Sequence, residues 1–292
     1  MSLAKFEIFS TVVESGSLKQ AAEILGLTQS AVSHAIASLE FEWGFIILIR
    51  GRAGIKLTSN GERVLKHIHE LLNRNEQMMQ EISSIKGLEI GTVRIGTFSS
   101  VSIQWLPEIL KNFNADFPAI DIKLLEGGYD TLEHWIATGT VDFGFVSLPT
   151  SKSFDVIFLK KDRMLCILSD EHRLANQQQV SVADIKDEML IMSRKGSDND
   201  LKRIFHENNV TPNIKFELSD DQAIISMVQN GMGISILPEM VLYRVPDNVR
   251  ILSLEGDPYR SIGIAAPSFN TISPAAQKFI DYMKAWLNNS HS

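Results

Sequence analysis

Short hydrogen-bonding side chains gather on one face of a helix that is predicted to begin after Thr28. The Thr28 hydroxyl can cap this helix by accepting a bond from a backbone N–H of the first turn. Helical spacing puts Val32, Ala35, Ile36 and Leu39 on one face and Gln29, Ser30, Ser33, His34 and Ala37 on the opposite one. A helix with such a polar face is suited to hydrogen bonding in the major groove of DNA.

The residues just upstream predict the first helix of the same motif. Ser17 can cap a helix, and Gln20, three residues later, can complete a capping box. Ala21 and Ala22 are small and allow a second helix to cross closely, and Gly26 tolerates the left-handed conformation that ends a helix. This order indicates a DNA-binding helix-turn-helix. The alternative is an ordinary helical hairpin whose polar face meets solvent.

The distribution of charge supports the DNA-binding interpretation, although the net charge of −7 argues against it. Residues 1–57 are neutral overall, and no acidic residue occurs between Trp43 and Gly61. Within that stretch two short strands at 46–50 and 55–57 flank a turn, which predicts a β-hairpin wing. Its basic residues, Arg50, Arg52 and Lys56, could reach phosphates or the minor groove. The alternative is a hairpin that only covers the core.

A first amphipathic helix is predicted at about residues 2–14, and a much longer one runs from Thr58 to about Lys86. The long helix carries a broad apolar band made of Val64, Leu65, Ile68, Leu71, Leu72, Met78, Met79, Ile82 and Ile85. At 1.5 Å per residue it spans roughly 42 Å, which exceeds what a small winged domain can cover. We expect a second subunit to pack on it, with Asn75 disfavouring slipped registers. The alternative is packing on the next domain of the same chain.

From residue 91 onwards the pattern changes to strands that alternate with helices. Strands are predicted at 92–96, 120–128, 141–149, 163–169, 189–192, 214–218, 233–237 and 261–266, and helices at 104–118, 130–139, 199–208, 221–230 and 274–287. Such alternation predicts a mostly parallel sheet with helices on both faces. About 200 residues of this pattern suit two lobes with a cleft, and ligands bind such sheets at the C-terminal ends of strands.

Composition and motifs argue against other classes of protein. The chain has 44% hydrophobic and 22% charged residues, as soluble globular proteins do, and no signal peptide or membrane span is predicted. The single cysteine, Cys166, lies in an apolar run and is expected in the core of a cytoplasmic protein.

An enzyme and a free solute-binding protein are the two alternatives to a DNA-binding protein. The histidines are scattered, and His67 and His69 are two residues apart, so they do not share a helical face for a metal ion. No phosphate-binding loop or nucleophile elbow is present, and we predict no catalytic residue, metal or cofactor. The N-terminal winged domain and the missing export signal argue against a free solute-binding protein.

The order of these motifs resembles that of the LysR-type transcriptional regulators. The matching residues are FEIFSTVVESGSLKQAAEILGLTQSAVSHAIASLEFEWG, starting at Phe6, followed by RGRAGIKLT and Gly61. Further along the chain, GTVRIG, LPEILKNFNADFP, LLEGG, TGTVDFGFVSLP and NGMGISILPEM resemble the effector-binding domain of that family. The resemblance covers nearly the whole chain.

The resemblance implies a fold, a division into domains and a set of partners. The fold would be α/β, with an N-terminal all-α winged helix-turn-helix, a long linker helix and a two-lobed doubly wound domain like the type 2 periplasmic binding proteins. The domains would be residues 1–58 for DNA binding, 59–87 for dimerisation and 91–292 for effector binding, with lobe I at 91–161 and 267–292 and lobe II at 162–266. The partners would be double-stranded promoter DNA, a second copy of the chain in a homodimer and then a homotetramer, a small anionic metabolite as co-inducer, and RNA polymerase, but no membrane.

The resemblance also assigns roles within the helix-turn-helix, which would run from about Leu18 to Ala37. The Gln29 amide can pair bidentately with adenine, and Ser30, Ser33 and His34 would complete base readout. The other DNA-binding residues would be Ser17, Lys19, Thr28, Arg50, Arg52 and Lys56. The family commonly has proline at the position of Ser30 and arginine at that of His34, so we expect a different operator preference. Ile47 and Leu48 replace its usual Leu-Phe pair with little consequence.

Hydroxyl-bearing residues at the ends of predicted strands mark the expected effector cleft. We expect Ser99, Ser100 and Ser102 to lie in a loop after the first strand, at a helix N-terminus where free N–H groups suit an anion. The other candidates are Tyr129, Ser147, Ser193 and Gly231. A plain cap and turn is the alternative for the serine cluster. Such a set of side chains suits a small carboxylate or a similar anion, but it does not identify the compound.

Overall fold

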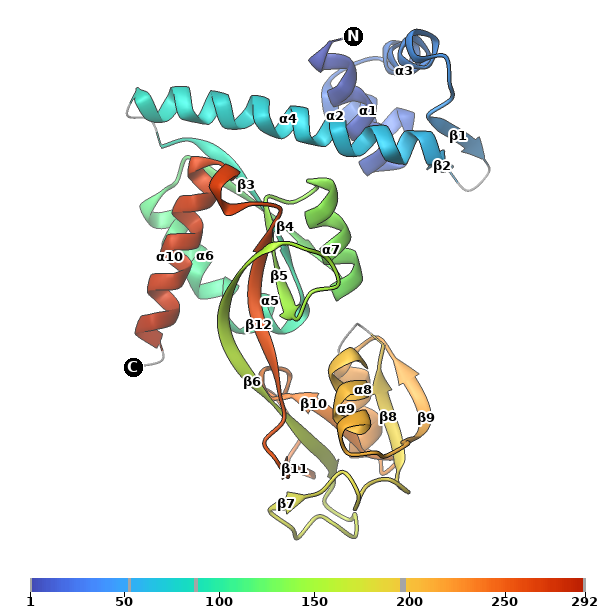
Figure 1. Ribbon diagram of the computed structural model, residues 1–292, viewed down its shortest axis with the longest axis vertical. Helices are drawn as coiled ribbons and strands as arrows, with labels where there is room; N and C mark the ends of the chain where they lie inside the picture. Colours follow the sequence, from blue (N-terminus) through green and yellow to red (C-terminus); the bar gives the residue numbers. More distant parts are fainter. Residues whose placement is uncertain (1, 52–53, 87–88, 195–197, 291–292) are drawn as a thin grey trace. The chain divides into compact units, whose positions relative to one another are not determined.

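The structure is a computed structural model that describes residues 2–51, 54–86, 89–194 and 198–290 (Figure 1). The chain forms two compact units. Unit 1 comprises Met1–Ile90 with Ala137–Thr140, and unit 2 comprises Gly91–Ile136 with Val141–Ser292. Each unit has a hydrophobic core of its own. No helix in the described part of the chain is long and apolar enough to cross a membrane.

Unit 1 consists of helices followed by a hairpin and a long helix. Its elements are α1 (Leu3–Ser15), α2 (Leu18–Leu25), α3 (Gln29–Trp43), β1 (Leu48–Gly51), β2 (Gly54–Leu57) and α4 (Ser59–Ile85). The capping residues behave as predicted, since the Ser17 hydroxyl accepts from the Gln20 N–H and the Thr28 hydroxyl from the Ala31 N–H. Gly26 adopts a φ of 65°, which ends α2 in the left-handed conformation.

The core of unit 1 fixes which face of α3 points outward. Val32, Ala35, Ile36 and Leu39 are buried, as helical spacing predicted. Phe9 and Val12 of α1, Ala21 and Ala22 of α2 and Ile47 before β1 belong to the same core. In the hairpin, β1 pairs antiparallel with β2, and Leu48 lies opposite Leu57. The polar face of α3 is therefore left on the outside of the three-helix core.

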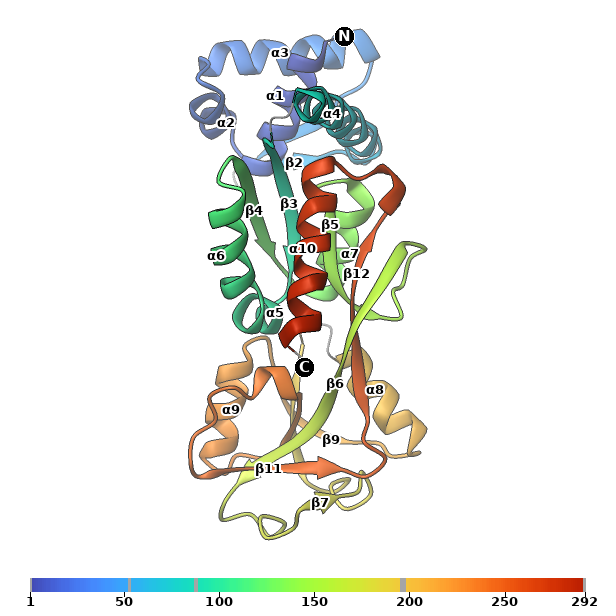
Figure 2. The same ribbon diagram turned by 90° about the vertical axis from the view of Figure 1, so that its left-hand side faces the viewer.

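Unit 2 is built on one large mixed sheet with helices packed around it (Figures 1 and 2). The strands follow the order β4-β3-β5-β12-β6-β11-β7, with β10 also pairing with β6. They are β3 (Gly91–Thr97), β4 (Ile120–Glu126), β5 (Phe143–Leu148), β6 (Asp155–Ser169), β7 (Gln179–Val180), β10 (Ser235–Pro238), β11 (Val249–Leu254) and β12 (Tyr259–Ala266). A separate parallel pair is formed by β8 (Met189–Ser193) and β9 (Asn213–Leu218).

The helices of unit 2 gather at the two ends of the sheet (Figure 2). At one end lie α5 (Ser99–Gln104), α6 (Leu106–Asp116), α7 (Tyr129–Thr138) and α10 (Pro274–Ser290), and at the other lie α8 (Asp198–Glu207) and α9 (Asp221–Gln229). Short 3-10 helices follow β10 at Glu239–Val241 (η1) and β12 at Phe269–Thr271 (η2). Separate hydrophobic clusters fill the two ends, one around Phe113, Phe143 and Phe279 and others around Cys166 and Ile224.

The long strands β6 and β12 connect the two ends and make the sheet mixed. The first part of β6 pairs with β12, and its last part pairs with β10 and β11, all antiparallel. β12 also pairs antiparallel with β5. The α/β fold class is as predicted, but the expectation of a mostly parallel sheet was wrong. The sequence predicted only the last seven residues of β6, 163–169, as a strand. The first half of β6 is partly exposed and therefore lacks the apolar pattern of a buried strand.

Candidate functional site

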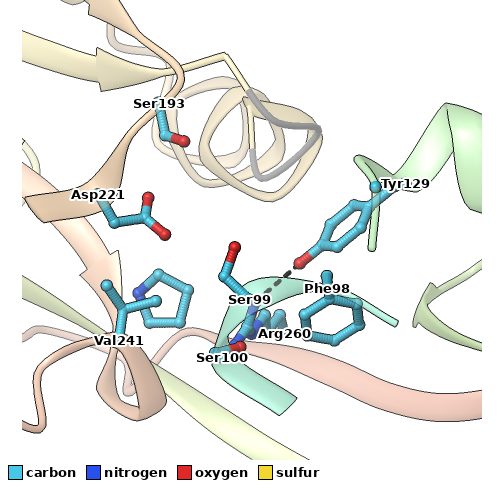
Figure 3. A pocket seen from close by; sticks show the side chains of 10 residues that line it. Phe98, Ser99, Ser100, Tyr129, Ser193, Asp221, Val241 and Arg260 are labelled. Atoms are coloured by element: carbon cyan, nitrogen blue, oxygen red, sulfur yellow. Dashed lines mark hydrogen bonds between the residues drawn. The ribbon is translucent and has the colours of Figure 1, made fainter. Parts of the chain in front are cut away.

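An open pocket lies in unit 2, lined by residues from both groups of helices and from the sheet (Figure 3). Its lining residues are Phe98, Ser99, Ser100, Gly127, Tyr129, Ser193, Asp221, Pro238, Val241 and Arg260. They lie at the ends of β3, β4, β8 and β10, at the starts of α5, α7 and α9, in η1 and, for Arg260, near the start of β12. Because β3 and β4 are parallel, the residues that follow them meet at the same edge of the sheet.

A buried arginine lies at the floor of this pocket. The Arg260 Nε donates to Oδ2 of Asp162 at 2.8 Å, and Nη2 is 2.7 Å from the same oxygen. Nη1 donates to the Tyr129 hydroxyl at 2.8 Å, and Nη2 donates to Ser100 Oγ at 2.7 Å. The guanidinium also stacks over the Phe98 ring, 5.2 Å from its centroid. The positive charge is therefore neutralised by Asp162 and shared with two hydroxyl groups.

The protonation states in this cluster follow from burial and from the ion pair. Burial raises the pKa of Tyr129, so its hydroxyl keeps its proton and can donate it. Burial alone would lower the pKa of Arg260, but the Asp162 carboxylate and the hydrogen bond to the Tyr129 hydroxyl raise it on balance, so the guanidinium stays charged. Burial also raises the pKa of Asp200, although the hydroxyl of Ser147 donates to its carboxylate at 3.1 Å and opposes the shift.

The pocket brings together four of the seven residues expected in an effector cleft, namely Ser99, Ser100, Tyr129 and Ser193. The other three lie elsewhere. Ser102 Oγ donates to Thr97 Oγ1, Ser147 bonds to Asp200, and Gly231 has a φ of 68° in the turn after α9. The expected helix N-terminus is present, because Ser99 and Ser100 begin α5, but the expectation of a loop through residue 102 was wrong.

Sequence reasoning missed Asp221 and Arg260, which are the charged residues of the pocket lining. Asp221 follows Asp220, whose carboxylate caps α9 by accepting from the backbone N–H groups of Gln222 and Ala223. In the sequence the two aspartates look alike, so nothing distinguishes the pocket residue from the cap. Arg260 pairs with a residue 98 positions away, and no local pattern reveals such a partner.

The predicted DNA-binding residues lie on the outer surface of unit 1. Gln29, Ser30 and His34 are exposed on α3, and Ser33 is half-buried. Ser17 and Thr28 cap α2 and α3. Lys19 is exposed beside Glu23, with 3.9 Å between the charged atoms, and Lys56 is exposed on β2. The backbone of Arg50 lies in β1, and Arg52 lies outside the described residues.

The only cysteine of the sequence, Cys166, is buried on β6, as expected. Burial raises the pKa of its thiol to about 12, with a smaller contribution from Glu188. Since the thiolate is the reactive form, this side chain is unsuited to redox sensing. In the described part of the chain, no group of three or more His, Cys, Asp or Glu residues could hold a metal ion.

We predict that Cys166 is unreactive in the folded protein. A thiol with a pKa of about 12 is almost entirely protonated at pH 8, and burial also blocks access. Ellman's reagent at pH 8 should detect no thiol in the native protein and one thiol per chain in concentrated urea. Native protein that reacts as fast as a small free thiol would contradict the assignment.

We also predict that Arg260→Leu destabilises unit 2 strongly, because it leaves the buried Asp162 carboxylate without its partner. The expected loss in the free energy of unfolding is about 3–5 kcal/mol. Arg163→Leu is the matched control, because Arg163 forms an exposed pair with Glu239 and its loss should cost at most about 1 kcal/mol. Urea unfolding followed by tryptophan fluorescence measures both, and equal losses would contradict the role of the buried pair.

Two known protein families match this chain, one in each of its two units. Residues 3–62 match the family described as "Bacterial regulatory helix-turn-helix protein, lysR family", and residues 86–288 match the "LysR substrate binding domain". The uncharacterised HTH-type transcriptional regulator YvbU of Bacillus subtilis is 34% identical over 287 residues, which cover 97% of this chain and 98% of YvbU.

Two solved structures extend the comparison. HinK, a LysR family transcriptional regulator from Pseudomonas aeruginosa, is 26% identical with a TM-score of 0.61, and the match covers 98% of each chain. CbnR in complex with its target DNA is 18% identical with a TM-score of 0.67, covering 98% of this chain and 99% of CbnR, which is a likeness of fold. The chain therefore belongs to the LysR-type family: it is a transcriptional regulator and not an enzyme, with a DNA-binding helix-turn-helix and a domain that binds a small-molecule effector.

Proposed function

We propose that α3 reads the operator sequence and that the residues around it bind phosphates. The observation that carries this proposal is the exposure of Gln29, Ser30 and His34 on a helix whose opposite face is locked in the core of unit 1. Gln29 lies in the first turn of α3, and the N-terminal residues of a recognition helix are those that contact base edges. Ser33 completes the reading face, and Ser17, Lys19, Thr28, Arg50, Arg52 and Lys56 hold the DNA backbone.

We propose further that residues 1–58, 59–87 and 91–292 serve DNA binding, dimerisation and effector binding. Lobe I of the effector domain comprises residues 91–161 and 267–292, and lobe II comprises 162–266. The last strand of lobe II, β12, pairs with β5 of lobe I over residues 261–265 and so links the two lobes. The pocket between the lobes holds the effector, for which the sequence favoured a small anion. Its hydroxyl groups from Ser99, Ser100 and Ser193 support a small polar molecule.

The exposed apolar residues of α4 support a homodimer that forms through this helix. Leu71, Met78, Met79, Ile82 and Ile85 are all at least 38% exposed. Ile68, which helical spacing put in the same apolar band, is 2% exposed and packs in the core of unit 1. The dimer then pairs into a homotetramer that works in the cytoplasm and contacts RNA polymerase at the promoter.

The two roles proposed for unit 1 give different changes in DNA binding. Gln29→Ala should weaken binding to the operator by about 1–3 kcal/mol and leave binding to random duplexes unchanged. Lys56→Ala should weaken binding to the operator and to random duplexes by a similar factor. It should also reduce the slope of log affinity against log salt concentration by about one, since one fewer counterion is released. Fluorescence anisotropy at several salt concentrations measures both effects. Full discrimination by the Gln29→Ala variant would refute base reading by this residue.

The dimer interface predicts an effect of charge on assembly. Met78→Glu combined with Met79→Glu adds two negative charges to the apolar face of α4 and should lower the sedimenting mass to that of a monomer. Lys66→Glu with His67→Glu is the matched control, because both residues are exposed on the same helix. If both double variants sediment like the wild type, α4 is not the dimer interface.

A further inference from the structure

The end of α7 packs as part of unit 1, although most of this helix belongs to unit 2. The segment that does so, Ala137–Thr140, contains the last residues of α7 and the turn that leads to β5. The other end of α7 begins with Tyr129, which lines the pocket and accepts a hydrogen bond from Arg260. A helix of 10 residues, about 15 Å long, therefore begins at the pocket and ends in unit 1.

Two side chains of α4 hold the backbone of this turn. Nδ1 of His69 lies 2.9 Å from the carbonyl oxygen of Thr138, and because a carbonyl can only accept, this nitrogen carries a proton and donates it. Nδ2 of Asn73 donates to the carbonyl oxygen of Gly139 at 2.8 Å. Residues 69 and 73 are one helical turn apart, so both lie on the same face of α4. These two bonds fasten the end of α7 to α4.

The turn lies directly against α4. Gly139 adopts a φ of 70°, in the left-handed region that favours glycine. A Cβ atom at this position would lie 3.0 Å from Nδ2 of Asn73 and 3.5 Å from Cβ of His69. The hydroxyl groups of Thr138 and Thr140 are 2.9 Å apart and close the turn. The contact is therefore a close fit of backbone against helix, in which a small displacement of the turn changes both hydrogen bonds.

His69 extends the connection to the first helix of unit 1. Its side chain is buried, and Nε2 lies 3.0 Å from Oγ of Ser10 on α1. The Ser10 hydroxyl also donates to the Glu14 carboxylate at 2.9 Å. α1 in turn packs on α2 and α3, the two helices of the helix-turn-helix. A displacement of the turn thus acts on α4 and, through His69, on the helix that supports the DNA-binding face.

We propose that α7 transmits effector binding from the pocket to the DNA-binding unit. A ligand that bonds to the Tyr129 hydroxyl alters the bond from Arg260 and displaces the start of α7. The helix moves as one body because Leu132 and Ile136 anchor its buried face, so the displacement reaches the turn held by α4. Effector binding and DNA binding then favour the same or opposite positions of α7, which is the coupling that regulation requires. This inference rests on the proposed effector pocket and specifies the route of its regulation.

A double-mutant cycle tests this route without a known effector. Tyr129→Phe removes the hydroxyl that meets Arg260 at the pocket end of α7, and Asn73→Ala removes one bond at the other end. Fluorescence anisotropy measures the affinity of the full-length protein, the two single variants and the double variant for a duplex selected from a random pool. Distant residues normally have independent effects, whereas here the double variant should differ from the product of the single effects by roughly threefold or more.

Ser100→Ala is the matched control for the pocket end. Ser100 accepts from the same Arg260 guanidinium, at 2.7 Å, but lies on α5 instead of α7. Its effect should combine with that of Asn73→Ala as a simple product, within about twofold. Independent effects of Tyr129→Phe and Asn73→Ala would overturn the inference. An equally large deviation in the Ser100→Ala cycle would also overturn it, because the coupling would then not run through α7.

A second experiment separates this inference from the proposed effector role. Wild-type and Asn73→Ala proteins are screened with succinate, glutarate, benzoate and the standard amino acids for a rise in melting temperature. The compound that raises it most should bind both proteins within about twofold when DNA is absent. It should change the duplex affinity of the wild type by a factor roughly threefold or more larger than in Asn73→Ala.

The outcomes of the screen are distinct. A compound that changes duplex affinity equally in both proteins would overturn the α7 route and leave the effector role of the pocket intact. If no compound alters the melting temperature, the effector role proposed for the pocket fails, while the double-mutant cycle still decides whether α7 couples the pocket to DNA binding.

Discussion

The ion pair between Arg260 and Asp162 is the interaction on which the effector domain depends. The two residues lie opposite each other on β12 and β6, the strands that connect the two ends of unit 2. Asp162 Oδ1 also accepts from the Met240 N–H of η1 at 3.1 Å, while Arg260 reaches Ser100 of α5 and Tyr129 of α7. One buried pair thus ties five elements together. Either partner alone would be a buried charge, which is strongly destabilising.

This arrangement determines what the pocket can recognise. A free arginine would make the pocket a general anion site, but here Asp162 neutralises the guanidinium before any ligand arrives. The remaining specificity lies in oriented hydroxyl groups, such as those of Ser100 and Ser193, which come from different ends of unit 2. A ligand that bonds to both ends stabilises one relative arrangement of the lobes. The family's use of an effector to alter DNA binding requires such a difference in affinity between two states.

Local patterns in the sequence predicted local features well. The caps at Ser17 and Thr28 and the buried face of α3 follow from spacing and residue type alone, and they were correct. Non-local features were missed for physical reasons. Half-exposed strands such as the first part of β6 lack an apolar pattern, and the partner of Arg260 lies 98 residues away. Ile68 on α4 shows the same limit, because spacing identifies an apolar face but not what covers it.

The central claim is that the pocket of unit 2 and the DNA-binding face of unit 1 are energetically coupled. Thermodynamic reciprocity tests this claim directly, because the effector must change DNA affinity by the same factor as DNA changes effector affinity. The measurement is the calorimetric affinity of the full-length protein for the small molecule that raises its melting temperature most, with and without a saturating duplex selected from a random pool. We predict that the two affinities differ, and that their ratio equals the change in duplex affinity that the same small molecule causes. Identical affinities with and without duplex would contradict the coupling.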